Sequence, residues 1–224
     1  MSLMKRTFLI LAALLLTVFT YGRHKVYDKN VRTLQVNLND NPLLPPVLKL
    51  GKSSYLRISW DEMSHNYHRY IYRIQHCTRD WEPTEDLFES DYLRGTNDLP
   101  VEDYETSFNT TQLYTHYSLV FPNRDASVLL SGNYKLLVYE EDFMDDGPVI
   151  EVRFHVVESE MGLTMQASSN TDIDFNDKHQ QVSLNLNYGS IRVTDPYNQI
   201  YAVVSQNRRP SRTVAGIRPD INKA

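Results

Sequence analysis

The sequence predicts an all-β protein, an antiparallel β-sandwich of the immunoglobulin or fibronectin kind followed by an incomplete second β domain. Apolar residues alternate with polar ones in short runs, which is the period of half-buried strands. Turn-forming residues (Asn, Asp, Gly and Pro) separate these runs. Tyrosine, which suits a half-buried pleated surface, occurs 15 times against 8 glycines.

Composition narrows the class of protein further. With 224 residues, 41% of them hydrophobic, the chain can bury the core of one or two domains. Acidic residues outnumber basic ones by 28 to 23 and no basic block stands out, which argues against binding to nucleic acid. Because Cys77 is the single cysteine, no disulfide can form within one chain.

Residues 1–22 read as a secretory signal peptide. Lys5 and Arg6 precede an apolar run over residues 7–19, and Gly22 is a small residue at the expected cleavage point. The alternative is an uncleaved anchor, but the run is shorter than the roughly 20 residues that span a bilayer. We therefore expect an exported protein without direct membrane insertion.

The expected first β domain covers residues 23–158. Its strands are marked by alternating apolar side chains: Leu34, Val36 and Leu38; Leu56, Ile58 and Trp60; Tyr70, Tyr72 and Ile74; Tyr117, Leu119 and Phe121; Tyr134, Leu136 and Val138; and Ile150, Val152, Phe154 and Val156. Six or seven short strands with this punctuation predict an antiparallel sandwich.

One stretch, residues 78–111, lacks the alternation and is expected to be a long, acidic loop. It carries the aromatic residues Trp81, Phe88, Tyr92 and Tyr104. A connection this long in a compact domain is either packed down by its own side chains or has a function. If it has a function, these four residues are the candidates for binding a partner, because aromatic anchors dominate many interfaces.

Residues 159–224 are predicted to begin a second β domain. Alternation restarts with Val182, Leu184 and Leu186, and again with Ile200, Ala202 and Val204. About three strands are marginal on their own, so this part either packs on the first domain or belongs to a sheet that is unfinished here. An unfinished sheet exposes an edge that invites pairing.

The residues give little support to catalysis or to a cofactor. His76 and Cys77 are neighbours in an expected strand, so their side chains point to opposite faces and form no dyad. His65 and His68 lie close together but lack further ligands nearby, and the acidic run at residues 140–146 lacks the register of a calcium loop. We expect no metal, no cofactor and no enzyme, but a binding or structural protein.

An ordered set of short motifs carries a resemblance. The motifs are His-Cys-Thr-Arg-Asp-Trp at 76–81, Ser-Phe-Asn-Thr at 107–110, Tyr-Thr-His-Tyr at 114–117, Phe-Pro-Asn at 121–123, Ser-Gly-Asn-Tyr at 131–134 and Val-Tyr at 138–139. In this order and spacing the sequence resembles the amino-terminal domain of the type IX secretion system plug protein family of Bacteroidota. The likeness covers residues 27–158, and residues 161–221 look like the start of that family's second domain.

The resemblance implies a non-enzymatic part in protein secretion. Such plugs are periplasmic, lie at the inner face of the outer membrane, and close the mouth of the outer-membrane translocon barrel while no cargo passes. Family members are longer than this chain, and the family supplies no catalytic residues to carry over. The alternative is an exported carbohydrate-binding sandwich, in which exposed tyrosines and Trp81 would stack on sugar rings.

Overall fold

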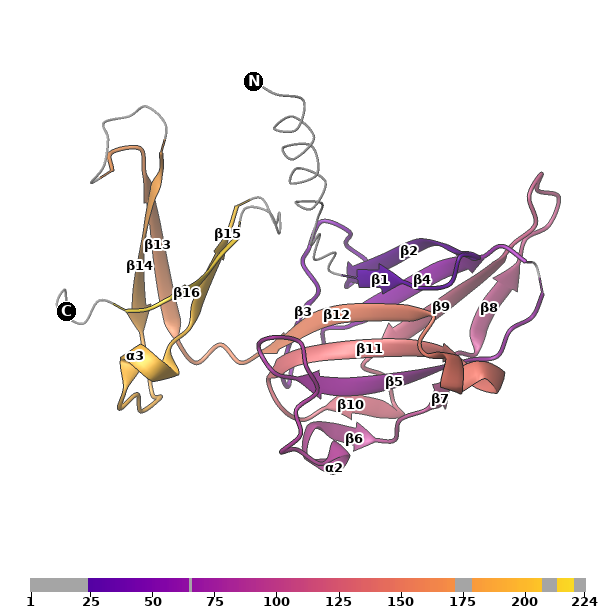
Figure 1. The fold of residues 1–224 in the computed structure, drawn as a ribbon, viewed down its shortest axis with the longest axis horizontal. Helices are drawn as coiled ribbons and strands as arrows, with labels where there is room; N and C mark the ends of the chain where they lie inside the picture. Colours follow the sequence, from indigo (N-terminus) through magenta and orange to yellow (C-terminus); the bar gives the residue numbers. More distant parts are fainter. Residues whose placement is uncertain (1–23, 65, 172–178, 207–212, 220–224) are drawn as a thin grey trace, which may run out of the picture. The chain divides into compact units, whose positions relative to one another are not determined.

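The structure is a computed structural model that describes residues 24–64, 66–171, 179–206 and 213–219 (Figure 1). The predicted signal peptide, residues 1–22, lies outside the described residues. By contacts between residues, the chain divides into two compact units, one over residues 23–191 and one from residue 192 onward. The predicted boundary between residues 158 and 159 stays a prediction.

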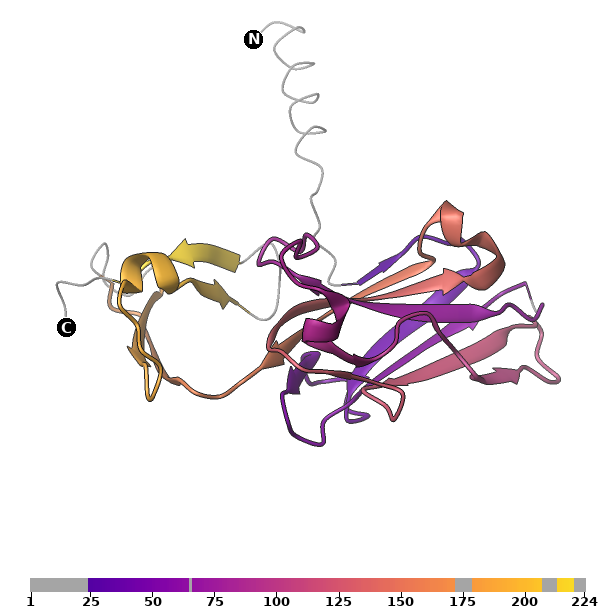
Figure 2. The same cartoon turned by 90° about the horizontal axis from the view of Figure 1, so that it is seen from below.

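The first domain is a sandwich of two sheets (Figure 2), which confirms the predicted all-β fold class. The larger sheet contains β1 (His24–Val26), β12 (Ile150–Val157), β11 (Gly132–Glu140), β5 (Tyr70–Cys77) and β7 (Leu99–Pro100) in spatial order, with β3 (Val47–Lys49) also on β12. The smaller sheet has the order β2 (Val31–Leu38), β4 (Leu56–Glu62), β9 (Thr115–Phe121) and β8 (Asp103–Thr106). All pairings in both sheets are antiparallel except that of β3 with β12.

Strand β12 is paired on both sides over most of its length. On one side lies β11, and on the other β1 pairs antiparallel with residues 150–152 while β3 pairs parallel with residues 155–157. Two short segments from the start of the domain therefore share one edge of the sheet. This arrangement leaves little of the β12 backbone free to pair with another chain.

The core is built from the side chains that the alternation marks. Strand register places Trp60 opposite Tyr117 and Tyr134 opposite Phe154. The Trp60 and Tyr117 rings stack with centroids 5.5 Å apart, and Tyr70 meets both rings edge-on. All of these rings are at most 2% exposed. The predicted inward residues of β4, β5, β9, β11 and β12 thus form one continuous core.

The stretch at residues 78–111 is more ordered than the predicted loop. It contains the one-turn helix α2 (Glu89–Tyr92) and the short strands β6 (Leu93–Gly95), β7 and β8. Strands β7 and β8 extend the edges of the two different sheets, and β6 pairs with β10 (Ala126–Val128). Strands of two to four residues are too short to show a period of two, which is why the sequence pattern missed them.

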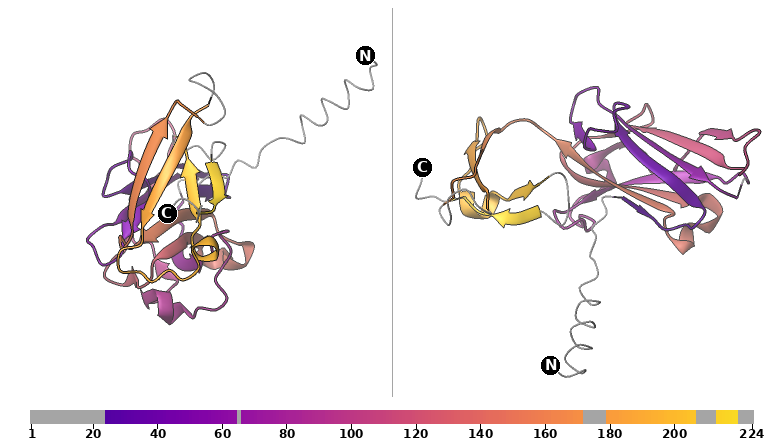
Figure 3. Two further views of the ribbon diagram at one scale, coloured as in Figure 1. Left: turned by 90° about the vertical axis from the view of Figure 1, so that its left-hand side faces the viewer. Right: turned by 90° about the horizontal axis from the view of Figure 1, so that it is seen from above.

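Beyond the sandwich the described chain forms two hairpins. The first joins β13 (Gly162–Ser168) to β14 (Gln181–Asn187) as a long two-stranded ribbon (Figure 3). The second joins β15 (Ala202–Ser205) to β16 (Thr213–Ile217) and follows the short helix α3 (Pro196–Gln199). The apolar residues that predicted β14 and β15 do lie in these strands, apart from Ile200, which ends α3.

The β13–β14 hairpin has two chemically opposite faces. Its register pairs Leu163 with Leu186 and Met165 with Leu184 on one face, whereas the other face pairs Thr164 with Asn185. The remaining pairs follow the same alternation, with Ala167 opposite Val182 on the apolar face and Gly162–Asn187, Gln166–Ser183 and Ser168–Gln181 on the polar one. Leu163 and Met165 are each 63% exposed, so the apolar face is largely uncovered.

Candidate partner-binding surface

Trp81 lies on the outer face of the larger sheet. It follows β5, with its backbone at φ +66°, and its ring lies 5.1 Å from the Arg153 guanidinium and 5.3 Å from the His155 ring. Arg153 and His155 alternate along β12 with core residues, so they point outward from the sandwich. The Trp81 ring therefore covers part of the row of outward-facing polar side chains on β12, and its contact with the Arg153 guanidinium is of the cation–π type.

The same row holds a nearly buried ion pair. Arg153 Nε donates to Glu151 Oε1 at 2.6 Å, and the Tyr27 hydroxyl donates to Glu151 Oε2 at 3.0 Å. Burial opposes ionisation of Glu151, but the hydrogen bonds from Arg153 and Tyr27 outweigh it and hold the pKa of Glu151 below its usual value. Burial, together with the Glu151 charge, raises the pKa of Tyr27 to about 12.

Phe88 precedes α2 and Tyr92 is the last residue of that helix, and the two side chains differ in exposure. Phe88 immediately precedes the helix, its backbone N–H donates to the Asp91 carboxylate at 2.9 Å, and it is 80% exposed. Tyr92 packs against the core, where its ring lies 5.8 Å from His76 and 6.2 Å from Tyr134. Phe88 is thus available to a partner, whereas packing within the domain accounts for most of Tyr92.

Tyr104 belongs to the other sheet. It lies on the edge strand β8, is 44% exposed, and contacts the rings of Tyr67 at 4.9 Å and Tyr117 at 5.8 Å. Tyr67 is itself 59% exposed, so the two rings form an aromatic patch at this edge. The sequence analysis missed Tyr67 because it lies 37 positions before Tyr104 and outside every alternating run.

The four candidate residues therefore do not form one cluster. Within the part of the chain that the structure describes, no ring contact joins any two of Trp81, Phe88, Tyr92 and Tyr104. Trp81, Phe88 and Tyr92 come from one connection between β5 and β6, and Tyr104 comes from β8. A partner that touches all four would have to contact both sheets.

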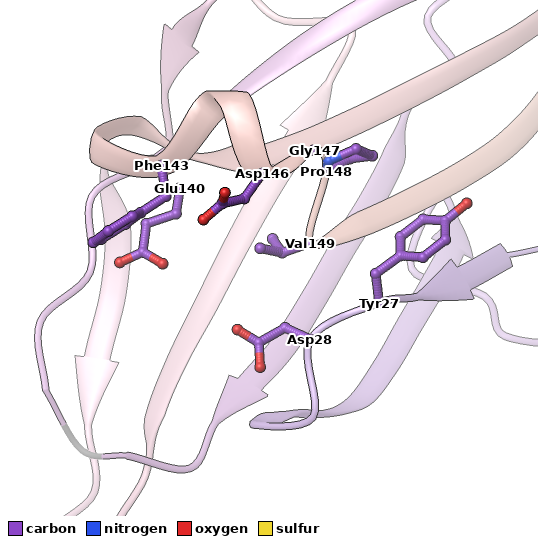
Figure 4. Close-up of a pocket in the computed structure, with 8 residues that line it drawn as sticks. All are labelled: Tyr27, Asp28, Glu140, Phe143, Asp146, Gly147, Pro148 and Val149. Carbon is purple, nitrogen blue, oxygen red and sulfur yellow. The ribbon is translucent and has the colours of Figure 1, made fainter.

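An acidic hollow lies where the chain leaves β11. The 3-10 helix η1 (Glu141–Asp146) follows that strand, and a hollow of about 390 Å³ opens beside it (Figure 4). The side chains of Asp28, Glu140 and Asp146 surround it, with Phe143 and Val149 among the apolar residues of its wall. Glu140 Oε1 lies 2.7 Å from Nδ1 of His68. The hollow is suited to a basic group rather than to an acidic one.

The described residues show no arrangement that would hold a metal ion. No group of three or more His, Cys, Asp or Glu side chains there converges as a metal site. His68 contacts Glu62 and Glu140 instead, and His65 lies outside the described residues. The acidic run at residues 140–146, which lacks the register of a calcium loop, forms η1 and the residue before it.

The chemistry of Cys77 is that of a buried thiol. Its side chain is buried, Sγ lies 3.7 Å from the Gln75 carbonyl oxygen, and burial raises the pKa of the thiol. Nδ1 of His76 lies 2.8 Å from the Thr84 hydroxyl and is not directed at the thiol of Cys77. These two residues therefore do not act as a nucleophile and its base.

Comparison with known proteins assigns the fold to a family. The model of the type 9 secretion system plug protein 1st domain matches residues 31–158, more than half of the chain. A crystal structure of a hypothetical protein from Parabacteroides merdae ATCC 43184 is similar, with 34% identity and a TM-score of 0.80 over 88% of this chain. This chain covers 49% of that protein, about half its length.

Two further findings complete the comparison. No curated protein matches the sequence. Among the described residues, none of the helices has the length and apolar character needed to cross a membrane. The family match includes β2 to β12, the whole sandwich except β1, and contains all four aromatic candidates. The chain belongs to the type 9 secretion system plug protein family, as its ordered motifs predict.

Proposed function

We propose that this chain forms part of a periplasmic plug that lies at the mouth of the type IX outer-membrane translocon and closes it while no cargo passes. The family match over residues 31–158 carries this proposal, since it covers the sandwich. The role requires binding and no bond-making chemistry, so the protein is proposed to act without catalysis. The exported location follows from the predicted signal peptide.

The physical character of the sandwich supports this role. A plug has to keep its shape while it covers a pore, and this domain has a continuous core of large rings between two sheets. It also presents separate exposed aromatic residues, Phe88 near α2 and Tyr104 on β8, of the kind that anchor protein interfaces. A rigid body with several anchors suits a removable stopper better than a single flexible loop would.

Geometry does not favour the carbohydrate-binding alternative. A platform for sugar rings needs aromatic side chains that lie side by side on one face. Here the Trp81 ring already contacts Arg153 and His155, and its nearest aromatic candidates in sequence, Phe88 and Tyr92, make no ring contact with it within the described residues.

Co-purification tests the proposal. The translocon is isolated in detergent from cells that carry the full-length protein, and the bound protein is quantified by mass spectrometry. We expect the protein to be present in a fixed ratio to the translocon. A clean absence of the unmodified full-length protein would overturn the proposed function.

A double variant tests whether the exposed aromatic residues Phe88 and Tyr104 make the contact with the translocon. Phe88→Ala combined with Tyr104→Ala should reduce the recovered protein about tenfold, because each removes an exposed aromatic anchor. Leu43→Ala is the matched control, since Leu43 is a 75% exposed apolar residue between β2 and β3 and is neither an aromatic candidate nor part of the acidic hollow. If the double variant and the control are recovered with the translocon in equal amounts, Phe88 and Tyr104 do not make the contact, and the proposed plug function is unaffected.

A further inference from the structure

A second hollow, of about 370 Å³, lies between β3 with its following turn and the two-stranded sheet of β6 and β10. Its apolar lining comes from Leu48, Leu50, Val128 and Leu129. Leu48 is 1% exposed and belongs to the core, while Leu50 and Val128 pack against that core. The floor of the hollow is therefore a fixed apolar surface, and its volume falls at the lower end of the range of about 300–1,000 Å³ for small-molecule pockets.

The charged residues that line this hollow are all cations. Lys49, Lys52 and Arg94 contribute to it, and no carboxylate does among the residues that the structure describes. None of the three forms an ion pair with a described residue. Other cations of this acidic chain do so: Arg57 pairs with Asp40 and Arg73 pairs with Asp98.

The fold, rather than a local run of basic sequence, brings these cations together. Lys49 ends β3, and Lys52 follows in a turn where its N–H donates to the Lys49 carbonyl oxygen at 3.2 Å. The Ser54 hydroxyl accepts from the Lys49 N–H at 3.1 Å, which ties the turn to the strand. Arg94 comes from β6, more than 40 residues later, where it lies opposite Ser127 of β10.

We infer that this hollow binds an amphiphilic anion, a carboxylate or phosphate head on a short alkyl chain. The alkyl chain would lie on Leu48, Leu50 and Val128, where burial of apolar surface is favourable. The anionic head would lie between Lys52 and Arg94, whose charges have no partner within the described chain. This inference is independent of the proposed plug function, because the site contains none of the four aromatic candidates.

Titration of the full chain, labelled with ¹⁵N, tests the site by NMR. The compounds are sodium octanoate, octyl phosphate, 1-octanol and inorganic phosphate, each below any micelle concentration. We expect saturable shifts of backbone amides at residues 48–54, 94 and 127–129 with octanoate or octyl phosphate, and at least tenfold weaker binding of octanol and of inorganic phosphate. The tighter of the two octyl compounds identifies whether a fatty carboxylate or a lipid-like phosphate is the natural class.

Variants separate charge from apolar contact. Lys52→Gln combined with Arg94→Gln should weaken octanoate binding at least tenfold and leave octanol binding unchanged, since only the head loses its partners. Lys29→Gln is the matched control, because Lys29 is an exposed lysine outside the hollow without an ion pair among the described residues. Ser127→Glu, which supplies a carboxylate opposite Arg94, should also reduce anion binding.

Three results would overturn the inference. One is the absence of saturable shifts with both octyl anions. Another is equal binding of octanol and octanoate, which would mean that the cations contribute nothing. The third is an equal loss of binding in the Lys29→Gln control and in the double variant. The amide spectrum of each variant reports directly whether the sandwich is still folded, so a loss of binding is not confused with unfolding.

Discussion

The sandwich and the β13–β14 hairpin use the same alternating pattern with opposite results. In the sandwich, Ile58 and Trp60 of β4 and Tyr117 and Phe121 of β9 lie in alternating runs and are fully buried. In the hairpin, Leu163 and Met165 alternate just as regularly, yet each is 63% exposed. Alternation therefore predicts a strand and its apolar face, but it does not predict whether a second layer covers that face.

The largest expected effect on the free energy of unfolding comes from a substitution in the core of the sandwich. Trp60→Ala removes a fully buried ring that stacks on Tyr117, and it should lower the free energy of unfolding by about 3–5 kcal/mol. Met165→Ala in the hairpin should change it by less than about 0.5 kcal/mol, because little buried surface is lost. Urea denaturation followed by circular dichroism measures both. Equal losses would show that the apolar face of the hairpin is covered in solution.

The next effect concerns the ion pair of Glu151 and Arg153 on the outer face of the larger sheet. Arg153→Met removes the cation that hydrogen-bonds the nearly buried Glu151 carboxylate and leaves only the partly exposed Lys25 ammonium, 3.9 Å away, so the free energy of unfolding at pH 7 should fall by about 2 kcal/mol. Adding Glu151→Gln to Arg153→Met removes the carboxylate charge too, so the double variant should regain part of the lost stability. A double variant as unstable as Arg153→Met alone would contradict this account.

The pH dependence of this pair has a definite sign. Because the pKa of Glu151 is held below its unfolded value, its contribution to stability is present above the unfolded pKa, about 4.3. That contribution is lost as the pH falls through the lower, folded pKa. The stability difference between the unmodified protein and Arg153→Met should therefore shrink between pH 5 and pH 3 in urea titrations. A constant difference would mean that Glu151 does not carry it.

The smallest expected effect is a coupling between two aromatic rings at the edge of the sandwich. The Tyr67 and Tyr104 rings contact each other while both are partly exposed, an intermediate case between core and hairpin. A double-mutant cycle with Tyr67→Ala and Tyr104→Ala should give a coupling of about 0.5–1.5 kcal/mol in urea unfolding. A coupling indistinguishable from zero would show that the two rings move independently.

Within the sandwich, how much the sequence could predict depended on the length of each strand. Strands β4, β5, β9, β11 and β12 have seven to nine residues, long enough for the alternation to mark both their existence and their inward side chains. Strands β6, β7 and β8 have two to four residues, too few for the alternation to mark them.

The candidate surfaces were predicted less completely than the fold. The aromatic residues of residues 78–111 could be named from composition, but their separation onto two sheets follows from β7 and β8, which the sequence did not reveal. The contact of Tyr67 with Tyr104 and the grouping of Lys52 with Arg94 join residues 37 to 42 positions apart. Such groupings depend on tertiary pairing, about which a single sequence carries no local signal.

The two opposite faces of the β13–β14 hairpin also fix its alignment. Sliding β14 by one residue would place both Leu184 and Leu186 opposite residues of the polar face of β13 and would turn the apolar side chains of β14 to the wrong face. The ribbon thus carries the information for its own register before anything packs against it. Any layer that covers Leu163 and Met165 would therefore pack on a surface whose side-chain spacing is already fixed by the register of the hairpin.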